Sequence, residues 1–251
     1  MNKKNLNRLI YVLKSFSART QYIADDHKII ALLASFHHER LKNLQPLLQS
    51  ILKCQFISRV FLSNHNPDIT VENWIKIKDE RLIVLNQPVR HGPGYCWELA
   101  KAEKSDFYLL VDDDFLVTPK QIKMLIQHLI DQPEIPHGIT GHSGPDYFQS
   151  MDMEVDRLSQ IYAVTRLHME QYFQYLEKIR AIDPDAFNAV EPYAHEIVMS
   201  RTGKGNPRIH HVGHLSRCHT ARKPGVAIHK DDNFSPERKK VIRALNTAMS
   251  S

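Results

Sequence analysis

Residues 107–114, FYLLVDDD, place three consecutive aspartates directly after five apolar residues. The apolar run is typical of a buried parallel strand. In an open α/β sheet, ligands bind at the carboxyl ends of the strands. Because side chains alternate along a strand, the pattern predicts that Asp112 and Asp114 point to one face and Asp113 to the other. The alternative is a solvated acidic turn that caps the following helix.

Adjacent carboxylates repel one another unless a cation or hydrogen-bond donors offset their charge. Mg²⁺ and Mn²⁺ prefer oxygen ligands, and they commonly bridge one or two carboxylates to substrate phosphates. The three aspartates therefore predict a site for one of these ions at the end of a central strand.

Strand and helix patterns alternate around this segment. Further strands are predicted at 28–36, 58–63, 81–85 and from 138–141, and helices at 39–54, 92–100 and 119–130. Alternation over some 115 residues predicts an open α/β sheet with mostly parallel strands. The second half is less regular, with helices predicted at 167–179, 194–201 and 236–248.

No linker rich in Gly, Ser or Pro divides the chain. We predict an N-terminal helical extension at 1–27 and one domain at 28–251, with a nucleotide-binding half at about 28–118 and an acceptor half at about 119–251. The net charge of +5 suits an anionic partner, but does not choose between a nucleotide, a nucleic acid and a lipid surface. Three cysteines without a CxxC pair indicate no disulfide framework, so we expect a reducing, cytoplasmic location.

The N-terminus lacks the pattern of a signal peptide, and no apolar run approaches the roughly 20 residues that span a bilayer. Apolar residues recur at helical spacing beside basic residues within 1–17. One interpretation is a helix packed on the domain. The alternative is a helix on an anionic membrane surface, which would place the protein peripherally at the inner membrane face.

The segment LLVDDDFLVTP (109–119) resembles the DxD segment of GT-A glycosyltransferases. Other segments strengthen the resemblance in the same order along the chain. They are ALLASF with HHER (31–40), RHGPG (90–94), PYAHEIV (192–198), which resembles the xED segment, and AIHKDDNFSPERKKVIRAL (227–245), which resembles the end of exostosin-like domains. The resemblance, which also has family 2-like features, implies a GT-A fold: a Rossmann-like, open mixed sheet flanked by helices.

The resemblance also implies roles for individual residues. Asp112 would contact the nucleotide and the metal, Asp114 would ligate the Mn²⁺ or Mg²⁺ that bridges the two phosphates, and Asp113 would assist. Glu196 would be the catalytic carboxylate, although the pair before Ile197 is His-Glu here and Glu-Asp in the family. His229 would be a late metal or phosphate contact.

Further substrate contacts are predicted at four positions: Asn64, Arg90, Asp156 and Lys230. The implied donor is a nucleotide-sugar, with a UDP-sugar favoured, and the acceptor is a carbohydrate or another hydroxyl compound. The sugar, the acceptor, the stereochemistry and the oligomeric state stay open.

Two other functions stay in view. A nucleotidyltransferase would also place carboxylates and Mg²⁺ at strand ends, but no Gly-rich phosphate loop with a basic residue lies near the first strand. A non-catalytic, basic nucleotide- or nucleic-acid-binding protein would use aromatic residues such as Tyr172, Phe173 and Tyr175. Those aromatics lie at helical spacing typical of a core, so no nucleic-acid partner is predicted.

Overall fold

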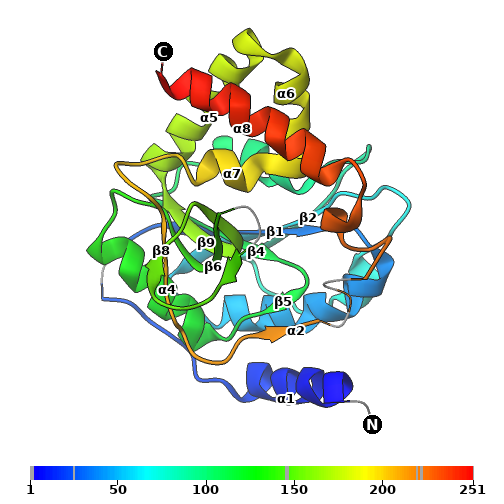
Figure 1. The fold of residues 1–251 in the computed structure, drawn as a ribbon. Coiled ribbons are helices and arrows are strands. Elements are labelled where there is room, and N and C mark those ends of the chain that lie inside the picture. The colour runs from blue at the N-terminus through cyan, green and yellow to red at the C-terminus, as the bar shows by residue number, and fades with distance from the viewer. Residues whose placement is uncertain (1–2, 25, 145–146, 219, 221–222, 251) are drawn as a thin grey trace.

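The computed structural model describes residues 3–24, 26–144, 147–218, 220 and 223–250, which form a sheet between two helical layers (Figure 1). The main sheet has nine strands in the order β3-β2-β1-β4-β9-β6-β10-β8, with β7 paired to β6. Strands β1 to β4 are parallel, and β9 is antiparallel to both of its neighbours. The predicted α/β class with a mixed sheet is confirmed.

The strands have these bounds: β1 Ile29–Ser35, β2 Ile57–Asn64, β3 Leu82–Asn86, β4 Phe107–Asp112, β5 Phe115–Leu116, β6 His137–Ser143, β7 Tyr147–Gln149, β8 Met153–Glu154, β9 Arg157–Thr165, β10 Arg208–Ile209 and β11 Ser216–Arg217. The α-helices are α1 Lys3–Ser17, α2 Leu41–Leu52, α3 Cys96–Lys101, α4 Pro119–Asp131, α5 Arg166–Ile182, α6 Pro184–Ala189, α7 His195–Met199 and α8 Phe234–Ser250. Short helical turns are η1 His38–Arg40, η2 Glu72–Trp74, η3 Pro93–Tyr95, the π-helical η4 Val190–Ala194 and η6 Ile228–Lys230.

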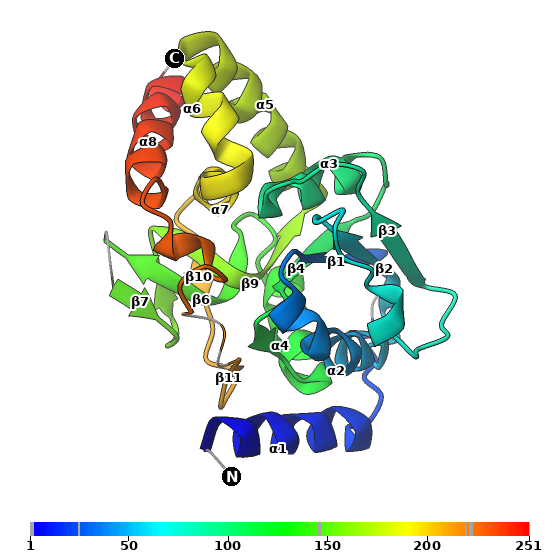
Figure 2. The same cartoon turned by 90° about the vertical axis from the view of Figure 1, so that its right-hand side faces the viewer.

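Alternation along the central strands fills two cores. In β1, Ile29, Ala31 and Leu33 pack against the layer that contains α2 and α4, whereas Ile30 and Leu32 pack against the opposite layer. Helices α3, α5, α7 and α8 form that second layer (Figures 1 and 2). Both faces of β1 are buried, which explains its continuous apolar run.

Two features of the sheet differ from the expectation. Strand β4 ends at Asp112, and a turn leads into β5, which pairs with β11 in a separate two-stranded sheet. Strand β9 is inserted antiparallel between β4 and β6. In its first half, Arg157, Ser159 and Gln160 are polar and only partly buried, and Leu158 is the one buried apolar residue, so the sequence pattern reveals only the apolar second half.

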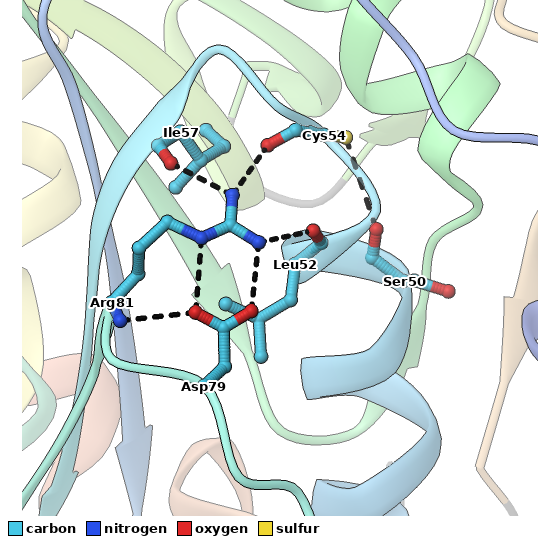
Figure 3. Close-up of polar contacts among 6 residues, drawn as sticks. All are labelled: Ser50, Leu52, Cys54, Ile57, Asp79 and Arg81. Carbon is cyan, nitrogen blue, oxygen red and sulfur yellow. Dashed lines mark hydrogen bonds and ion pairs between the residues drawn. The ribbon is translucent and has the colours of Figure 1, made fainter.

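Arg81 joins the end of α2 to the start of β3 (Figure 3). Its guanidinium donates to the carbonyl oxygens of Leu52 at 2.6 Å, Cys54 at 3.2 Å and Ile57 at 3.1 Å. It also forms an ion pair of 2.8 Å with Asp79. Carbonyl groups at a helix C-terminus lack partners within the helix, so a cation there stabilises the end of α2.

Among the described residues, no helix combines the length and the hydrophobicity needed to cross a membrane. Cys54, Cys96 and Cys218 are buried and free.

Candidate active site

Asp112 is the last residue of β4, and Asp113 and Asp114 form the turn into β5. Asn43 of α2 donates to the carbonyl oxygen of Asp113 at 3.0 Å, and the backbone N–H of Cys218 donates to that of Asp114 at 2.8 Å. The strand does not continue through Asp114, so the simple alternation expected of the three side chains is wrong. Asp113 and Asp114 are only 4% and 5% exposed, which also excludes a solvated acidic turn.

Arg40, the last residue of η1, holds two of the aspartates. Its Nη1 lies 2.8 Å from Oδ1 of Asp113, and its Nη2 lies 3.0 Å from Oδ2 of Asp114. The other oxygen of Asp114, Oδ1, is buried, and no described residue forms a hydrogen bond with it. Oδ1 of Asp114 is therefore a buried acceptor that has no partner among the described protein atoms. A bound cation would satisfy it.

The electrostatics of the cluster also favour a cation. Burial, followed by the charges of Asp114 and Asp113, raises the pKa of Asp112 well above its usual range. Burial raises the pKa of Asp114 to about 6, although Arg40 opposes the shift. A nearby positive charge reduces the repulsion between ionised carboxylates and so favours their ionised forms. Because the donors are carboxylate oxygens, the residues fit Mg²⁺ or Mn²⁺.

A different group of possible metal ligands lies closer together. Among the described residues, only His37, His38 and Glu39 place three ligand atoms within 4.8 Å of one another. The carboxylate of Glu39 is already paired with Lys223 at 2.5 Å. The aspartates do not converge to this degree, and Arg40 occupies two of them. Binding a metal at the aspartates would therefore compete with the ion pairs of Arg40.

Glu196 lies in the first turn of α7 and is largely buried. It forms an ion pair with Arg238 of α8, and its Oε2 lies 3.8 Å from Nε2 of His195. Burial acts to raise the pKa of Glu196, but Arg238 and His195 together lower it below its usual value. Its charge contributes to the raised pKa of Asp112, so the two carboxylates act on the same interior region. The start of α7 therefore lies within electrostatic range of the end of β4.

Two glycines permit this approach. A Cβ atom on Gly92 would lie 2.4 Å from the Cα of Pro192, and one on Gly94 would lie 2.8 Å from the Cβ of His195. The N–H of Gly92 donates to the carboxylate of Glu191 at 2.8 Å. The glycines of the RHGPG segment therefore allow close packing of η3 on η4 and α7.

Arg217 acts on Asp114 through its charge and is bonded to Gln160, and neither residue was predicted from the sequence. The charge of Arg217 lowers the pKa of Asp114, against the larger effect of burial. Its guanidinium donates to Oε1 of Gln160 at 3.0 Å and lies 3.9 Å from the ring centroid of Phe148. Gln160 has a φ of 64°, in the left-handed region that is unfavourable for residues other than glycine. Strained backbone conformations cluster at functional sites. Here the strained Gln160 is bonded to the guanidinium of Arg217, whose charge acts on Asp114.

Two predicted substrate contacts have structural partners. The buried amide of Asn64 donates to the carbonyl oxygen of Ile69 at 2.6 Å and to Oδ1 of Asn86 at 2.9 Å, so it organises the loop after β2. Arg90 is exposed and forms an ion pair of 2.6 Å with Asp68. It also lines a cavity of about 400 Å³ between η3, α5 and η4, which none of the three aspartates lines. Their roles in substrate binding stay predictions.

The other predicted contacts lie on exposed segments. Asp156, just before β9, accepts a hydrogen bond from the N–H of Gly144, just after β6. His229 and Lys230 are exposed on η6, and the ring centroid of His229 lies 6.4 Å from that of Phe234. The structure places η6 directly before α8, which supplies Arg238. A metal or phosphate contact of His229, and substrate contacts of Asp156 and Lys230, stay predictions.

No family model matches the sequence, and no curated protein matches it. Solved structures do match. One is GalNAc-T7 with UDP, GalNAc and Mn²⁺, with a TM-score of 0.59 and 10% identity over 89% of this chain and 48% of that chain. Another is S. aureus TarS 1–349 in complex with UDP-GlcNAc, with a TM-score of 0.59 and 15% identity over 88% of this chain and 66% of that chain.

The chain thus spans about half the length of the first matched structure and just under two thirds of the second. A weaker likeness, with a TM-score of 0.46 and 14% identity, is to the 4-diphosphocytidyl-2C-methyl-D-erythritol synthase of Anaerococcus prevotii, and it carries no argument. The two stronger matches cover nearly the whole chain and agree with its mixed sheet and flanking helices. The protein therefore has the GT-A fold of nucleotide-sugar glycosyltransferases.

Proposed function

We propose that this protein is a metal-dependent glycosyltransferase, which transfers a sugar from a nucleotide-diphosphate donor to an acceptor hydroxyl. One observation carries the proposal. In a GT-A fold, Asp112 lies partly buried at the end of β4 and Asp114 lies buried in the turn that follows, with one carboxylate oxygen unpartnered among the described residues. The charge of Glu196 acts on the pKa of Asp112.

Asp112 and Asp114 would hold the Mn²⁺ or Mg²⁺, which neutralises the charge that develops on the leaving diphosphate. Asp113 keeps the turn in place through its ion pair with Arg40. Glu196 would accept the proton of the acceptor hydroxyl. Its lowered pKa keeps it ionised at neutral pH, as a base must be, while the ion pair with Arg238 fixes its orientation.

The two matched structures contain UDP and UDP-GlcNAc, respectively, which favours a UDP-sugar as the donor of this protein. The acceptor would be a carbohydrate or another hydroxyl compound. The three free, buried cysteines support a reducing, cytoplasmic compartment.

The test is thermal unfolding with UDP, GDP or CMP, each with and without Mn²⁺, because a ligand of the folded state raises the Tm by mass action. We expect UDP with Mn²⁺ to raise the Tm. Asp114→Ala should abolish the increase, and Glu177→Ala, which removes an exposed carboxylate on α5, should preserve it. Full metal-dependent stabilisation of Asp114→Ala by UDP would refute the site.

Product analysis separates this proposal from the nucleotidyltransferase alternative. A glycosyltransferase releases a nucleoside diphosphate, whereas a nucleotidyltransferase releases pyrophosphate. A basic binding protein would instead show steeply salt-dependent binding of RNA or DNA, with no effect of metal or UDP.

A further inference from the structure

Helix α1 is held to the domain along one side. Tyr11 is 2% exposed, and its hydroxyl donates to the carbonyl oxygen of Val117 at 2.7 Å. The hydroxyl of Ser50 lies 3.0 Å from the hydroxyl oxygen of Tyr11 and can donate to it. Ser15, one turn further along α1, is fully buried, and Lys53 donates to the carbonyl oxygen of Ala18 at 2.8 Å. These contacts fix which face of α1 is turned toward α2 and β5.

The other side of α1 is apolar and exposed. Leu9, Ile10, Leu13 and Phe16 are 46%, 40%, 60% and 52% exposed. At 100° per residue, Leu9, Leu13 and Phe16 form one stripe roughly opposite Tyr11. Figures 1 and 2 show α1 at the outer edge of the molecule, with α2 on its inner side. A contiguous apolar stripe of this kind on a protein surface marks a site of interaction.

The charge of residues 1–24 favours an anionic partner for this face of α1. The first acidic residue of the sequence is Asp25, and the preceding residues include five basic ones, Lys3, Lys4, Arg8, Lys14 and Arg19. Lys14 and Arg19 are exposed. A helix with an apolar face, basic residues and no acidic ones is suited to the surface of an anionic bilayer, where the apolar face enters the boundary of headgroups and acyl chains.

We propose that α1 binds the surface of an anionic lipid membrane through Leu9, Leu13 and Phe16, with the basic residues of the segment contacting the headgroups. Its 15 residues are too short to cross a bilayer, so it lies in the plane of the interface. Because Tyr11 bonds to Val117, just beyond β5, the bound membrane has a fixed orientation relative to the aspartate turn. The lipid binding does not depend on the proposed transferase activity.

The test is flotation of the full chain with vesicles of phosphatidylcholine alone or mixed three to one with phosphatidylglycerol. We expect binding to the anionic vesicles only, weakened by salt. The double variant Leu13→Ser/Phe16→Ser should reduce the partition coefficient by at least about tenfold, because two large apolar side chains no longer enter the interface. Lys14→Glu should reduce it by more than about fivefold, since each basic residue contributes about 1 kcal/mol.

The matched control is Leu167→Ser/Met249→Ser, which removes two apolar side chains that are 73% and 45% exposed elsewhere on the surface. The control should bind vesicles like the wild type. Equal binding of the wild type and the Leu13/Phe16 variant, or no binding of the wild type, would overturn the proposal. A dimer in sedimentation equilibrium that the Leu13/Phe16 variant loses, without vesicle binding, would assign the face to a second copy of the chain instead.

Discussion

Replacing Arg40 tests whether the aspartate turn is held by a charge that a metal can replace. Arg40→Gln removes the partner of Asp113 and Asp114, whose side chains are 6% and 8% exposed. Breaking a buried ion pair by removing one partner costs about 3–5 kcal/mol. For a chain of this length, each kcal/mol corresponds to about 2–4 °C in Tm. We therefore expect the metal-free variant to unfold at least about 6 °C below the wild type.

The loss should depend on pH in a defined direction. In the folded protein, burial already raises the pKa of Asp114 to about 6, above that of an unfolded aspartate, and removing Arg40 raises it further. A carboxyl group with a raised pKa binds more protons when folded, so its unfavourable contribution grows as the pH rises and fades as the pH falls. The difference in Tm between Arg40→Gln and the wild type should shrink between pH 8 and pH 5.

Manganese supplies the distinguishing measurement. In Arg40→Gln, Mn²⁺ should restore much of the lost stability, because the ion offsets the charge that Arg40 neutralised. Arg81→Gln is the matched control: it should also lower the Tm, through the carbonyl groups and Asp79 shown in Figure 3, but Mn²⁺ should not rescue it. An Arg40→Gln protein as stable as the wild type, or equal rescue of both variants, would refute the reasoning.

Three further variants test Glu196, the packing of Gly92, and His210, a buried histidine that follows β10. Glu196→Gln should keep Mn²⁺-dependent UDP binding and lose about 100-fold or more in transfer rate; unchanged transfer would exclude it as the base. Gly92→Ala should cost about 1–3 kcal/mol in unfolding experiments, because its Cβ would lie 2.4 Å from the Cα of Pro192, whereas Gly205→Ala, whose Cβ would lie 3.5 Å from Cγ2 of Ile135, should be neutral. Burial lowers the pKa of His210 to about 3, so its contribution to stability is present above about pH 6.5 and lost as the pH falls toward 3. His210→Gln should therefore show a shallower loss of stability between pH 7 and pH 5, and an unchanged slope would contradict this.

The sequence predicts the strands and helix starts that are determined by residues close together in the chain. Strands β1 and β4 are buried on both faces, so each appears as a nearly continuous apolar run, and the aspartates follow the second of them. Helix α4 begins with Pro119 after the N-cap Thr118, which also forms a capping box with Gln121. Such signals depend on neighbours in the sequence.

The arginines of the site depend on the tertiary structure instead. Arg40 lies 73 residues from Asp113, and Arg238 lies 42 residues from Glu196, so no local spacing indicates either pair. The left-handed conformation of Gln160 is also not predicted from the sequence, because it lies at a shift in the register between β9 and β6, which depends on tertiary pairing. The residues that tune the carboxylates are those that a single sequence does not reveal.

The charges of the assembled site predict the order in which ligands bind. Three guanidinium groups, from Arg40, Arg217 and Arg238, act on the aspartate turn and Glu196. If the carboxylates of the three aspartates and of Glu196 are all ionised, four negative charges face three positive ones, and the net charge of the site is −1. Among the described residues, Asp112 forms no ion pair.

A diphosphate approaching this excess would be repelled, whereas a divalent cation reverses the sign of the local charge. Mn²⁺ alone should therefore raise the Tm, UDP in the presence of EDTA should leave it unchanged, and UDP added after Mn²⁺ should raise it further. If UDP stabilises the protein equally in EDTA, then the arginines alone suffice for nucleotide binding, and the carboxylates of β4 have another role.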